Sequence, residues 1–280
     1  MRVMVSKGYV VLAQNTAEDD YVKQAYALAL SIHATQTEKN ISILTNDNVP
    51  EEYLHAFDQV IAIPWEDTNS RFRAENRWKI YHITPYDETI VLDTDMLMLK
   101  NIDDWWWYAQ DHNLLFCEKT LNFKGEIIDS SMYRKTFTAN QLPNTHFALH
   151  YFKKSQQAEY FYKTLEFVVN NWAWCYGKFA PEHYQDWLSM DLAAAIALEM
   201  AGMNECADVC SPLRFVHMKP GVQDWHPVPL YWTDTIPHIY TKDGELIVGN
   251  IKQHHLFHYV EKDFVADGNI IAKLKGLING

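Results

Sequence analysis

The chain has 280 residues, of which 48% are hydrophobic and 21% are charged, values typical of a folded globular protein. This composition excludes a largely disordered chain and a collagen-like one. The net charge of −12 argues against a general polyanion binder, because phosphate contacts need clustered Lys and Arg, although it leaves room for a local basic groove.

The sequence also indicates where the protein works. No apolar run approaches the ~20 residues that span a bilayer, and the first apolar run is too short for a signal-peptide core. The cysteines form no Cys-x-x-Cys pair, which favours reduced thiols. We therefore expect a cytoplasmic protein without a membrane span.

The first hundred residues alternate between strand and helix patterns. Short apolar runs that end in polar residues predict buried strands over 8–14, 41–44, 60–63 and 89–92. Helical spacing of apolar residues and the positions of prolines predict helices over 20–36, 50–57 and 74–83. This order predicts a mostly parallel α/β sheet flanked by helices, with right-handed crossovers.

The rest of the chain is less regular. Further strands are predicted over 96–99, 114–117, 147–152 and 213–217. Helices are predicted over 155–171, 190–200 and 270–278, and a hairpin over 239–248. No change in composition marks a second domain, so we expect a single domain over 1–280.

Two aspartates follow directly on the fourth predicted strand, in Asp93-Thr94-Asp95. In extended backbone, side chains at i and i+2 share a face, so the two carboxylates converge and need a cation. Ligands of open α/β sheets bind at the carboxyl ends of the strands. Carboxylate oxygens suit Mg²⁺ or Mn²⁺, whose coordination is usually completed by substrate phosphates. The motif therefore predicts a metal ion with a diphosphate; the alternative is a surface turn with two solvated aspartates.

With this motif in this position, the sequence over about residues 8–220 resembles the GT-A glycosyltransferases, above all the glycogenin-like and lipopolysaccharide galactosyltransferase group, and glycosyltransferases of bacteriophages. The resemblance implies a Rossmann-like GT-A fold, with a nucleotide-binding half at about 1–100 and an acceptor-side half at about 101–280. It implies transfer of a sugar from a nucleotide sugar, with a UDP-sugar as the expected donor, to an acceptor hydroxyl with retention of configuration. Mn²⁺ or Mg²⁺ would be the cofactor.

The resemblance also implies which residues bind the donor. Tyr21 would stack on the base and Asn15 would contact it. Arg77 and Lys79, with Arg71 and Arg73 upstream, form the densest basic cluster of the chain, and such groups neutralise phosphate. The implied donor-binding set is Ala13, Gln14, Asn15, Tyr21, Arg77, Lys79, Thr94 and Lys219.

Metal and catalytic residues are implied in the same way. The metal ligands would be Asp93, Asp95 and His217, the last from His217-Met218-Lys219-Pro220. A competing candidate for the third ligand is the cluster His254, His255 and His258. The catalytic set would be Asp191, Asn144 and His146, the histidine standing where the family has glycine. The structural alternatives are a packed core histidine at 217 and helix capping by Asp191.

Two other classes of function remain open. A haloacid-dehalogenase-like phosphatase also ends an apolar strand in Asp-x-Asp, but there the strand is N-terminal and glycine is expected where Met96 stands. A non-catalytic nucleotide-sugar-binding module would suit the many aromatic residues, but would not need a reactive metal site. The acceptor is open as well: a glycan, a protein, or hydroxymethylcytosine in phage DNA, which would require a basic face.

Overall fold

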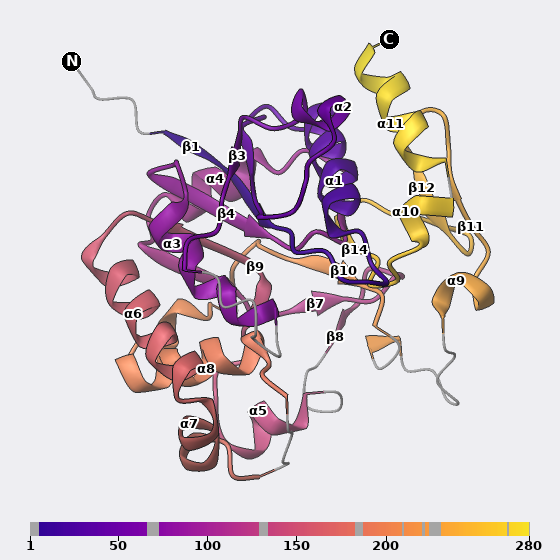
Figure 1. Ribbon diagram of the computed structural model, residues 1–280. Helices are drawn as coiled ribbons and strands as arrows, with labels where there is room; N and C mark the ends of the chain where they lie inside the picture. Colours follow the sequence, from indigo (N-terminus) through magenta and orange to yellow (C-terminus); the bar gives the residue numbers. More distant parts are fainter. Residues whose placement is uncertain are drawn as a thin grey trace.

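The computed structural model describes residues 6–65, 73–128, 134–182, 187–208, 210–219, 222–223, 231–267 and 269–279. Within these residues, a six-stranded sheet runs through the middle of the molecule (Figure 1). In spatial order its strands are β3 (Gln59–Ile61), β2 (Ile41–Leu44), β1 (Lys7–Leu12), β4 (Glu88–Leu92), β9 (His146–Lys153) and β6 (Leu114–Cys117). The strands from β3 to β4 are parallel, whereas β9 runs antiparallel to both of its neighbours. The mostly parallel sheet expected from the sequence is confirmed.

Helices lie on both sides of this sheet. The longer ones are α1 (Tyr21–Thr35), α4 (Asp103–Ala109), α6 (Gln156–Asn170), α7 (Trp172–Phe179), α8 (Met190–Ala201) and α11 (Ile270–Asn279). The shorter ones are α2 (Glu51–Leu54), α3 (Ile80–Ile83), α5 (Lys135–Ala139), α9 (Trp232–Thr235), α10 (Phe264–Asp267) and the 3-10 helices η1 (Arg73–Lys79) and η2 (Asn204–Cys206). The single helix expected over 74–83 is therefore a 3-10 helix continued by one α-helical turn.

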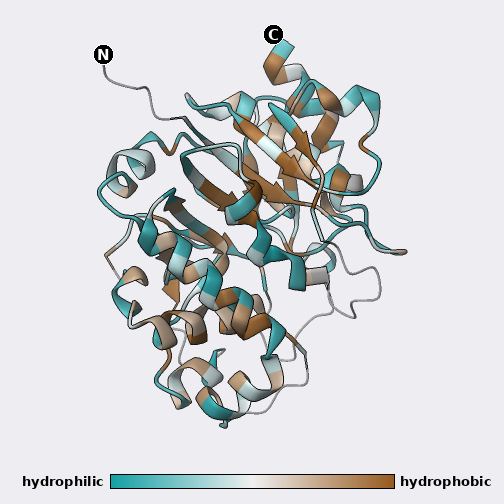
Figure 2. Cartoon of the chain, turned by 60° about the vertical axis from the view of Figure 1, so that its left-hand side comes forward, coloured by the Kyte–Doolittle hydropathy of each residue, from teal (hydrophilic) through white to brown (hydrophobic). Residues whose placement is uncertain are grey.

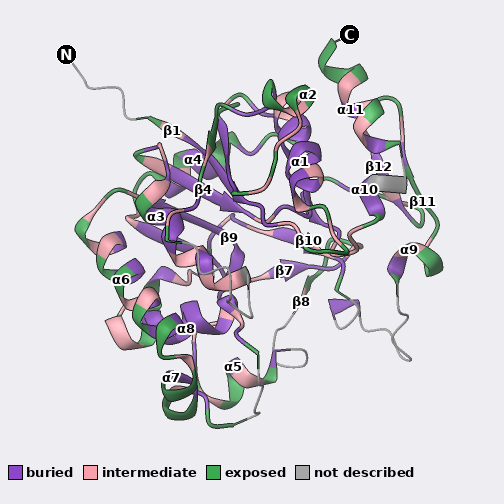
Figure 3. Ribbon diagram, viewed as in Figure 1, coloured by how far each residue is buried: buried purple, intermediate pink, exposed green. Residues whose placement is uncertain are grey.

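Both faces of the central sheet are buried, because alternate residues of one strand pack into different cores. In β1, Tyr9 and Val11 join the core that contains the buried faces of α1 and α4. Val10 and Leu12 join the core formed with α6 and α8. Figure 3 shows the strands buried between helices whose outer faces are exposed, and Figure 2 shows apolar residues concentrated on the central strands. A strand covered on both faces is apolar throughout, which explains the unbroken apolar run in the sequence.

Two smaller sheets accompany the central one. One contains β5 (Met96–Met98), β14 (Leu256–His258), β10 (Phe215–His217), β7 (Thr120–Leu121) and β8 (Ile127–Ile128), in that order. The other contains β11 (His238–Tyr240), β12 (Leu246–Val248) and β13 (Ile251–Lys252). The hairpin expected over 239–248 is present, with Gly244 in its turn at φ +81°. Within the described residues, no helix combines the length and the apolar character needed to cross a bilayer.

Candidate active site

Three potential metal ligands meet at the end of β4. One ligand atom each from Asp93, Asp95 and His258 can be chosen so that all three lie within 4.8 Å of one another. Asp95 and His258 are buried, and the Nε2 atom of His258 lies 3.0 Å from Oδ2 of Asp95. Two carboxylates and an imidazole, drawn together at this spacing, form a donor set that fits Mn²⁺ or Mg²⁺.

Strand pairing explains how residues so far apart in the sequence meet. The strand β5 begins directly after the aspartate motif and pairs antiparallel with β14, so that Met96 faces His258. The backbone carbonyl of Asp95 accepts a hydrogen bond from the N–H of Tyr259 at 3.1 Å. On the other side of the motif, the N–H of Asp93 donates to the carbonyl of Ala148 in β9. Both ends of the motif are therefore fixed by sheet hydrogen bonds.

Two basic side chains pair with the carboxylates. The guanidinium of Arg77 lies 2.5 Å from Oδ1 of Asp93, and the ammonium of Lys262 lies 2.6 Å from Oδ2 of Asp95. Burial alone would raise the pKa of Asp95, but His258 and Lys262 outweigh it and hold that pKa well below its usual range. Burial likewise opposes the charge of Lys262, but Asp95 more than compensates and raises the pKa of the ammonium. Both members of this pair are charged at neutral pH.

These groups line a cavity of about 370 Å³. Its wall is formed by residues of β1, α1, η1, the aspartate motif and the segment around β14, namely Leu12, Gln14, Thr16, Tyr21, Ala74, Arg77, Asp93, Thr94, Asp95, His258 and Lys262. The volume lies within the range of about 300–1,000 Å³ for small-molecule sites. An aromatic ring, two basic groups and a carboxylate pair in one cavity can accommodate a base and a diphosphate.

Of the implied donor-binding residues, Gln14, Tyr21, Arg77 and Thr94 line this cavity. The ring of Tyr21 is half-buried at the start of α1, and the Lys262 ammonium lies 5.1 Å from its centre. Asn15 is in the adjoining loop, where its side-chain oxygen accepts a hydrogen bond from the N–H of Val22 at 3.0 Å. Asn15 is thus hydrogen-bonded to the first turn of α1, in which Tyr21 also lies.

The remaining donor-binding candidates lie around the cavity. The N–H of Ala13 donates to the carbonyl of Leu44, which extends the β1–β2 pairing. Lys79 is buried, and its ammonium lies 2.6 Å from both the carbonyl of Trp65 and the side-chain oxygen of Asn76. Lys219 is exposed. The phosphate contacts expected of Lys79 and Lys219 stay predictions.

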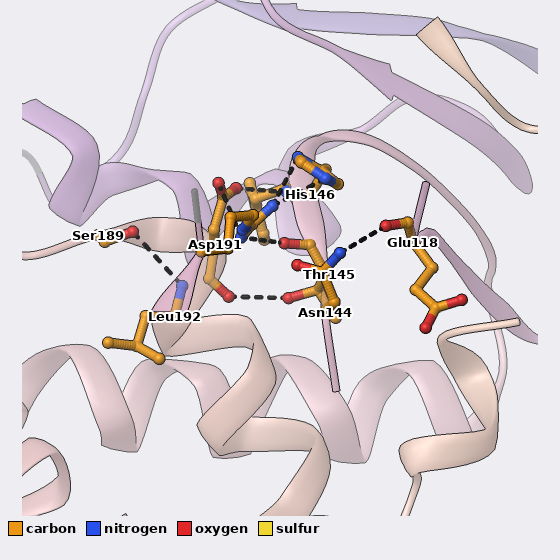
Figure 4. Close-up of polar contacts among 9 residues, drawn as sticks. Glu118, Asn144, Thr145, His146, Ser189, Asp191 and Leu192 are labelled. Carbon is orange, nitrogen blue, oxygen red and sulfur yellow. Dashed lines mark hydrogen bonds and ion pairs between the residues drawn. The ribbon is translucent and has the colours of Figure 1, made fainter. Parts of the chain in front are cut away.

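A second polar cluster contains the three residues implied as catalytic (Figure 4). Asp191 lies in the first turn of α8, and its carboxylate accepts a hydrogen bond from the N–H of Phe147 and pairs with Arg134. Ser189 caps this helix by accepting from the N–H of Leu192, so the capping role considered for Asp191 belongs to Ser189. Asp191 instead joins α8 to β9.

Asn144 and His146 flank this cluster. The side-chain nitrogen of Asn144 donates to the carbonyl of Glu118 at 2.7 Å, whereas its buried oxygen has no hydrogen-bond partner among the described residues. His146 is buried with Nδ1 2.6 Å from a guanidinium nitrogen of Arg134. Because a guanidinium only donates, that ring nitrogen accepts, and burial together with Arg134 holds the pKa of His146 well below its usual value. His146 is therefore a neutral imidazole.

The group of three potential ligands contains His258 in place of His217, whose role as a metal ligand stays a prediction. His217 does not belong to the three-residue group; its ring stacks on that of His258, with centroids 4.8 Å apart and planes 19° apart. His258 comes from the cluster that competed for the third position, whose other members, His254 and His255, lie outside the group.

Lys262 was not expected from the sequence, because nothing in its local pattern distinguishes it from a solvated lysine. Its position four residues after His258 is the one signal that could have indicated it. Two residues that accompanied the predicted motifs, Arg71 and Pro220, lie outside the described residues.

Comparison with known proteins finds similarity at the level of fold. No protein-family model and no curated protein matches the sequence. Among solved structures, the galactosyltransferase LgtC, in complex with donor and acceptor sugar analogs, is 13% identical with a TM-score of 0.49, over 97% of this chain and 95% of its own. Mouse xyloside xylosyltransferase 1 is 10% identical with a TM-score of 0.46, over 71% of this chain and 84% of its own.

The glycosyltransferase GlyE of Streptococcus pneumoniae TIGR4 is 15% identical with a TM-score of 0.38, over 70% of this chain. The match covers 43% of the GlyE chain, so the present chain spans less than half of that protein. The functional argument therefore rests on the geometry of the site.

Proposed function

We propose that this protein is a metal-dependent glycosyltransferase that moves a sugar from a nucleotide sugar to an acceptor hydroxyl. One observation carries the proposal: Asp93, Asp95 and His258 converge in a cavity that also contains Tyr21, Arg77 and Lys262. The haloacid-dehalogenase-like alternative requires a first aspartate free to attack phosphorus, whereas Asp93 is paired with Arg77. A UDP-sugar is the donor that the sequence resemblance favours.

In this proposal the chain binds the two ends of the donor separately. Tyr21 offers its ring to the base, and Arg77 and Lys262 supply positive charge beside the diphosphate. Mn²⁺ or Mg²⁺, held by Asp93, Asp95 and His258, would supply a Lewis acid that neutralises the departing nucleoside diphosphate. Negative charge develops on that leaving group as the sugar is transferred, so fixed positive groups lower the barrier.

The reacting sugar would lie toward Asp191. This assignment is supported by a carboxylate that is held by the N–H of Phe147 and by Arg134 and whose side chain is still 36% exposed. His146 is buried behind Asp191 and neutral, so we assign it the role of holding Arg134. Retention of configuration follows from the sequence resemblance, and no nucleophile is assigned.

For the acceptor, we favour a hydroxyl of a glycan or protein over hydroxymethylcytosine in DNA. The reason is charge: a duplex needs clustered Lys and Arg, whereas this chain carries a net charge of −12. If DNA were the acceptor, transfer would fall steeply as salt is raised between 50 and 200 mM, because bound counterions are released when the complex forms.

The test is a panel of nucleotide sugars incubated with the protein and Mn²⁺ or Mg²⁺, with release of nucleoside diphosphate followed over time. The matched control is the double variant Asp93→Asn/Asp95→Asn, which removes both charges and keeps the side-chain size. Release that requires the metal and is lost in the variant would support the proposal and name the donor. If no donor is turned over in the presence of glycan, protein and modified-DNA acceptors, the protein is a binding module and the proposal fails.

A further inference from the structure

Lys262 pairs with the same oxygen of Asp95 that lies next to the potential metal ligand His258. Its ammonium lies 2.6 Å from Oδ2 of Asp95, and Nε2 of His258 lies 3.0 Å from the same oxygen. A divalent cation bound to that oxygen would sit about 2.0–2.6 Å from it. A divalent cation and an ammonium on the same oxygen repel each other and compete for its negative charge, so binding of the metal ion there weakens the ion pair.

Displacing Lys262 is costly unless its charge finds a new partner. The Asp95 side chain is only 5% exposed, and an ammonium moved away from its carboxylate inside a poorly solvated cavity loses most of its stabilisation. The Lys262 side chain is more exposed than that of Asp95, at 28%, and it lines the cavity. A diphosphate in the same cavity offers the anion that the displaced ammonium needs.

We propose that Lys262 competes with the metal ion for Asp95, so that the protein binds the metal weakly alone and much more tightly with a nucleoside diphosphate. The inference rests on the proposed function and concerns how the same site is regulated. Coupling of this kind is reciprocal, since the metal must then raise the affinity for the nucleotide by the same factor. The ion pair would keep the metal site closed until donor and metal are both present.

The first test measures Mn²⁺ affinity by electron paramagnetic resonance, with and without UDP, in the wild type and in Lys262→Met. Removing the competitor should tighten Mn²⁺ binding without UDP by about tenfold, and UDP should then enhance binding less than in the wild type, within the usual 5–150-fold range of coupling. Lys262→Arg, which keeps the charge, should behave like the wild type. The control is Lys252→Met, an exposed lysine paired with Glu245, which makes the same change in net charge.

The second test is made on the wild-type protein. The side-chain ammonium of Lys262 is followed by nitrogen-15 NMR in the wild type, with Lys262→Arg used only to assign the signal. Saturation with Mg²⁺ should release the ammonium from Asp95 and speed its exchange with water, and UDP should then slow that exchange again. A signal that stays unchanged when Mg²⁺ is bound would overturn the inference.

The outcomes separate this inference from the proposed function. Mn²⁺ binding that is equal or weaker in Lys262→Met overturns the competition and leaves the metal site standing. Absence of Mn²⁺ binding in all variants, with and without UDP, overturns the metal site and the inference together. Tighter binding in Lys262→Met but not in Lys252→Met supports both.

Discussion

The carboxylate of Asp191 lies 2.7 Å from the backbone nitrogen of Phe147, so the first turn of α8 is joined to the beginning of β9. Its second oxygen lies 3.2 Å from the guanidinium of Arg134, which in turn contacts His146. A carboxylate bound through both oxygens is held in one orientation, which is what a group that acts on a substrate requires. The same contacts also join α8 to β9, and this structural role of Asp191 can be separated from its proposed role in catalysis.

Replacing Asp191 with Asn separates them, because the amide oxygen can still accept from Phe147 while the charge beside Arg134 is lost. We expect kcat to fall about 100-fold with little change in the donor KM, because an electrostatic group at the reacting sugar acts on the transition state. Steady-state kinetics with the donor found in the panel measures this effect. Asp104→Asn, on the exposed side of α4, is the matched control. An unchanged kcat in Asp191→Asn would leave the residue with a structural role alone.

The choice between histidines can be tested by metal affinity. We expect His258→Gln to weaken Mn²⁺ binding at least tenfold, because an imidazole ligand next to Asp95 is lost. His217→Phe should retain most of the affinity, since a ring remains stacked against His258. His254→Gln, an exposed member of the same cluster, serves as the control. Loss of affinity in His217→Phe equal to that in His258→Gln would restore His217 as a metal ligand.

Acid should destabilise the fold through His150. Its ring is fully buried between the carbonyl of Phe147 and the hydroxyl of Tyr162, and burial lowers its pKa to about 3. As the pH falls, the unfolded chain therefore takes up a proton at this imidazole before the folded chain does. The contribution of His150 to the free energy of unfolding is complete above the unfolded pKa of ~6.5 and is lost as the pH falls towards 3. From pH 7 to pH 5 the free energy of unfolding should fall by about 2 kcal/mol from this group.

Urea unfolding at pH 7, 6 and 5 measures this slope. In His150→Phe the contribution of the group is absent, so the loss between pH 7 and pH 5 should be smaller by that amount, whatever the starting stability of the variant. Phe161→Leu, which shortens a buried side chain of the neighbouring core and removes no titratable group, is the control and should keep the wild-type slope. Parallel slopes for the wild type and His150→Phe would be incompatible with a buried neutral imidazole.

Gly8, in β1, lies so close to neighbouring atoms that there is no space for a side chain at this position. A Cβ atom at this position would lie 2.5 Å from the ring of Tyr86 and 2.8 Å from the carbonyl of Asn40. The Tyr86 hydroxyl is bonded to Ser42 and Asp58, so the ring cannot easily move away. We expect Gly8→Ala to lower the free energy of unfolding by about 1–3 kcal/mol, as measured by urea unfolding. Gly177→Ala, where nothing lies within 4 Å, should cost nothing or stabilise α7 slightly.

The features that could be predicted from the sequence are those that depend on local periodicity. The four parallel strands and the aspartate motif at the end of the fourth were expected, because unbroken apolar runs mark strands covered on both faces. The third potential metal ligand was not identified uniquely, since it depends on the pairing of β5 with β14, two strands of three residues each. The helix cap at Ser189 was not identified either, because serine and aspartate two residues apart offer equivalent local signals.

The pairing of β5 with β14 also has a consequence for biosynthesis. The Asp93 and Asp95 carboxylates leave the ribosome long before His258 and Lys262 are made, with 167 residues separating Asp95 from Lys262. Arg77 precedes Asp93 and can pair with it at once, but Asp95 lacks His258 and Lys262 until the C-terminal segment has been made and β14 docks. The site therefore cannot be completed until most of the chain has been made, and its assembly requires the closure of a loop of 167 residues.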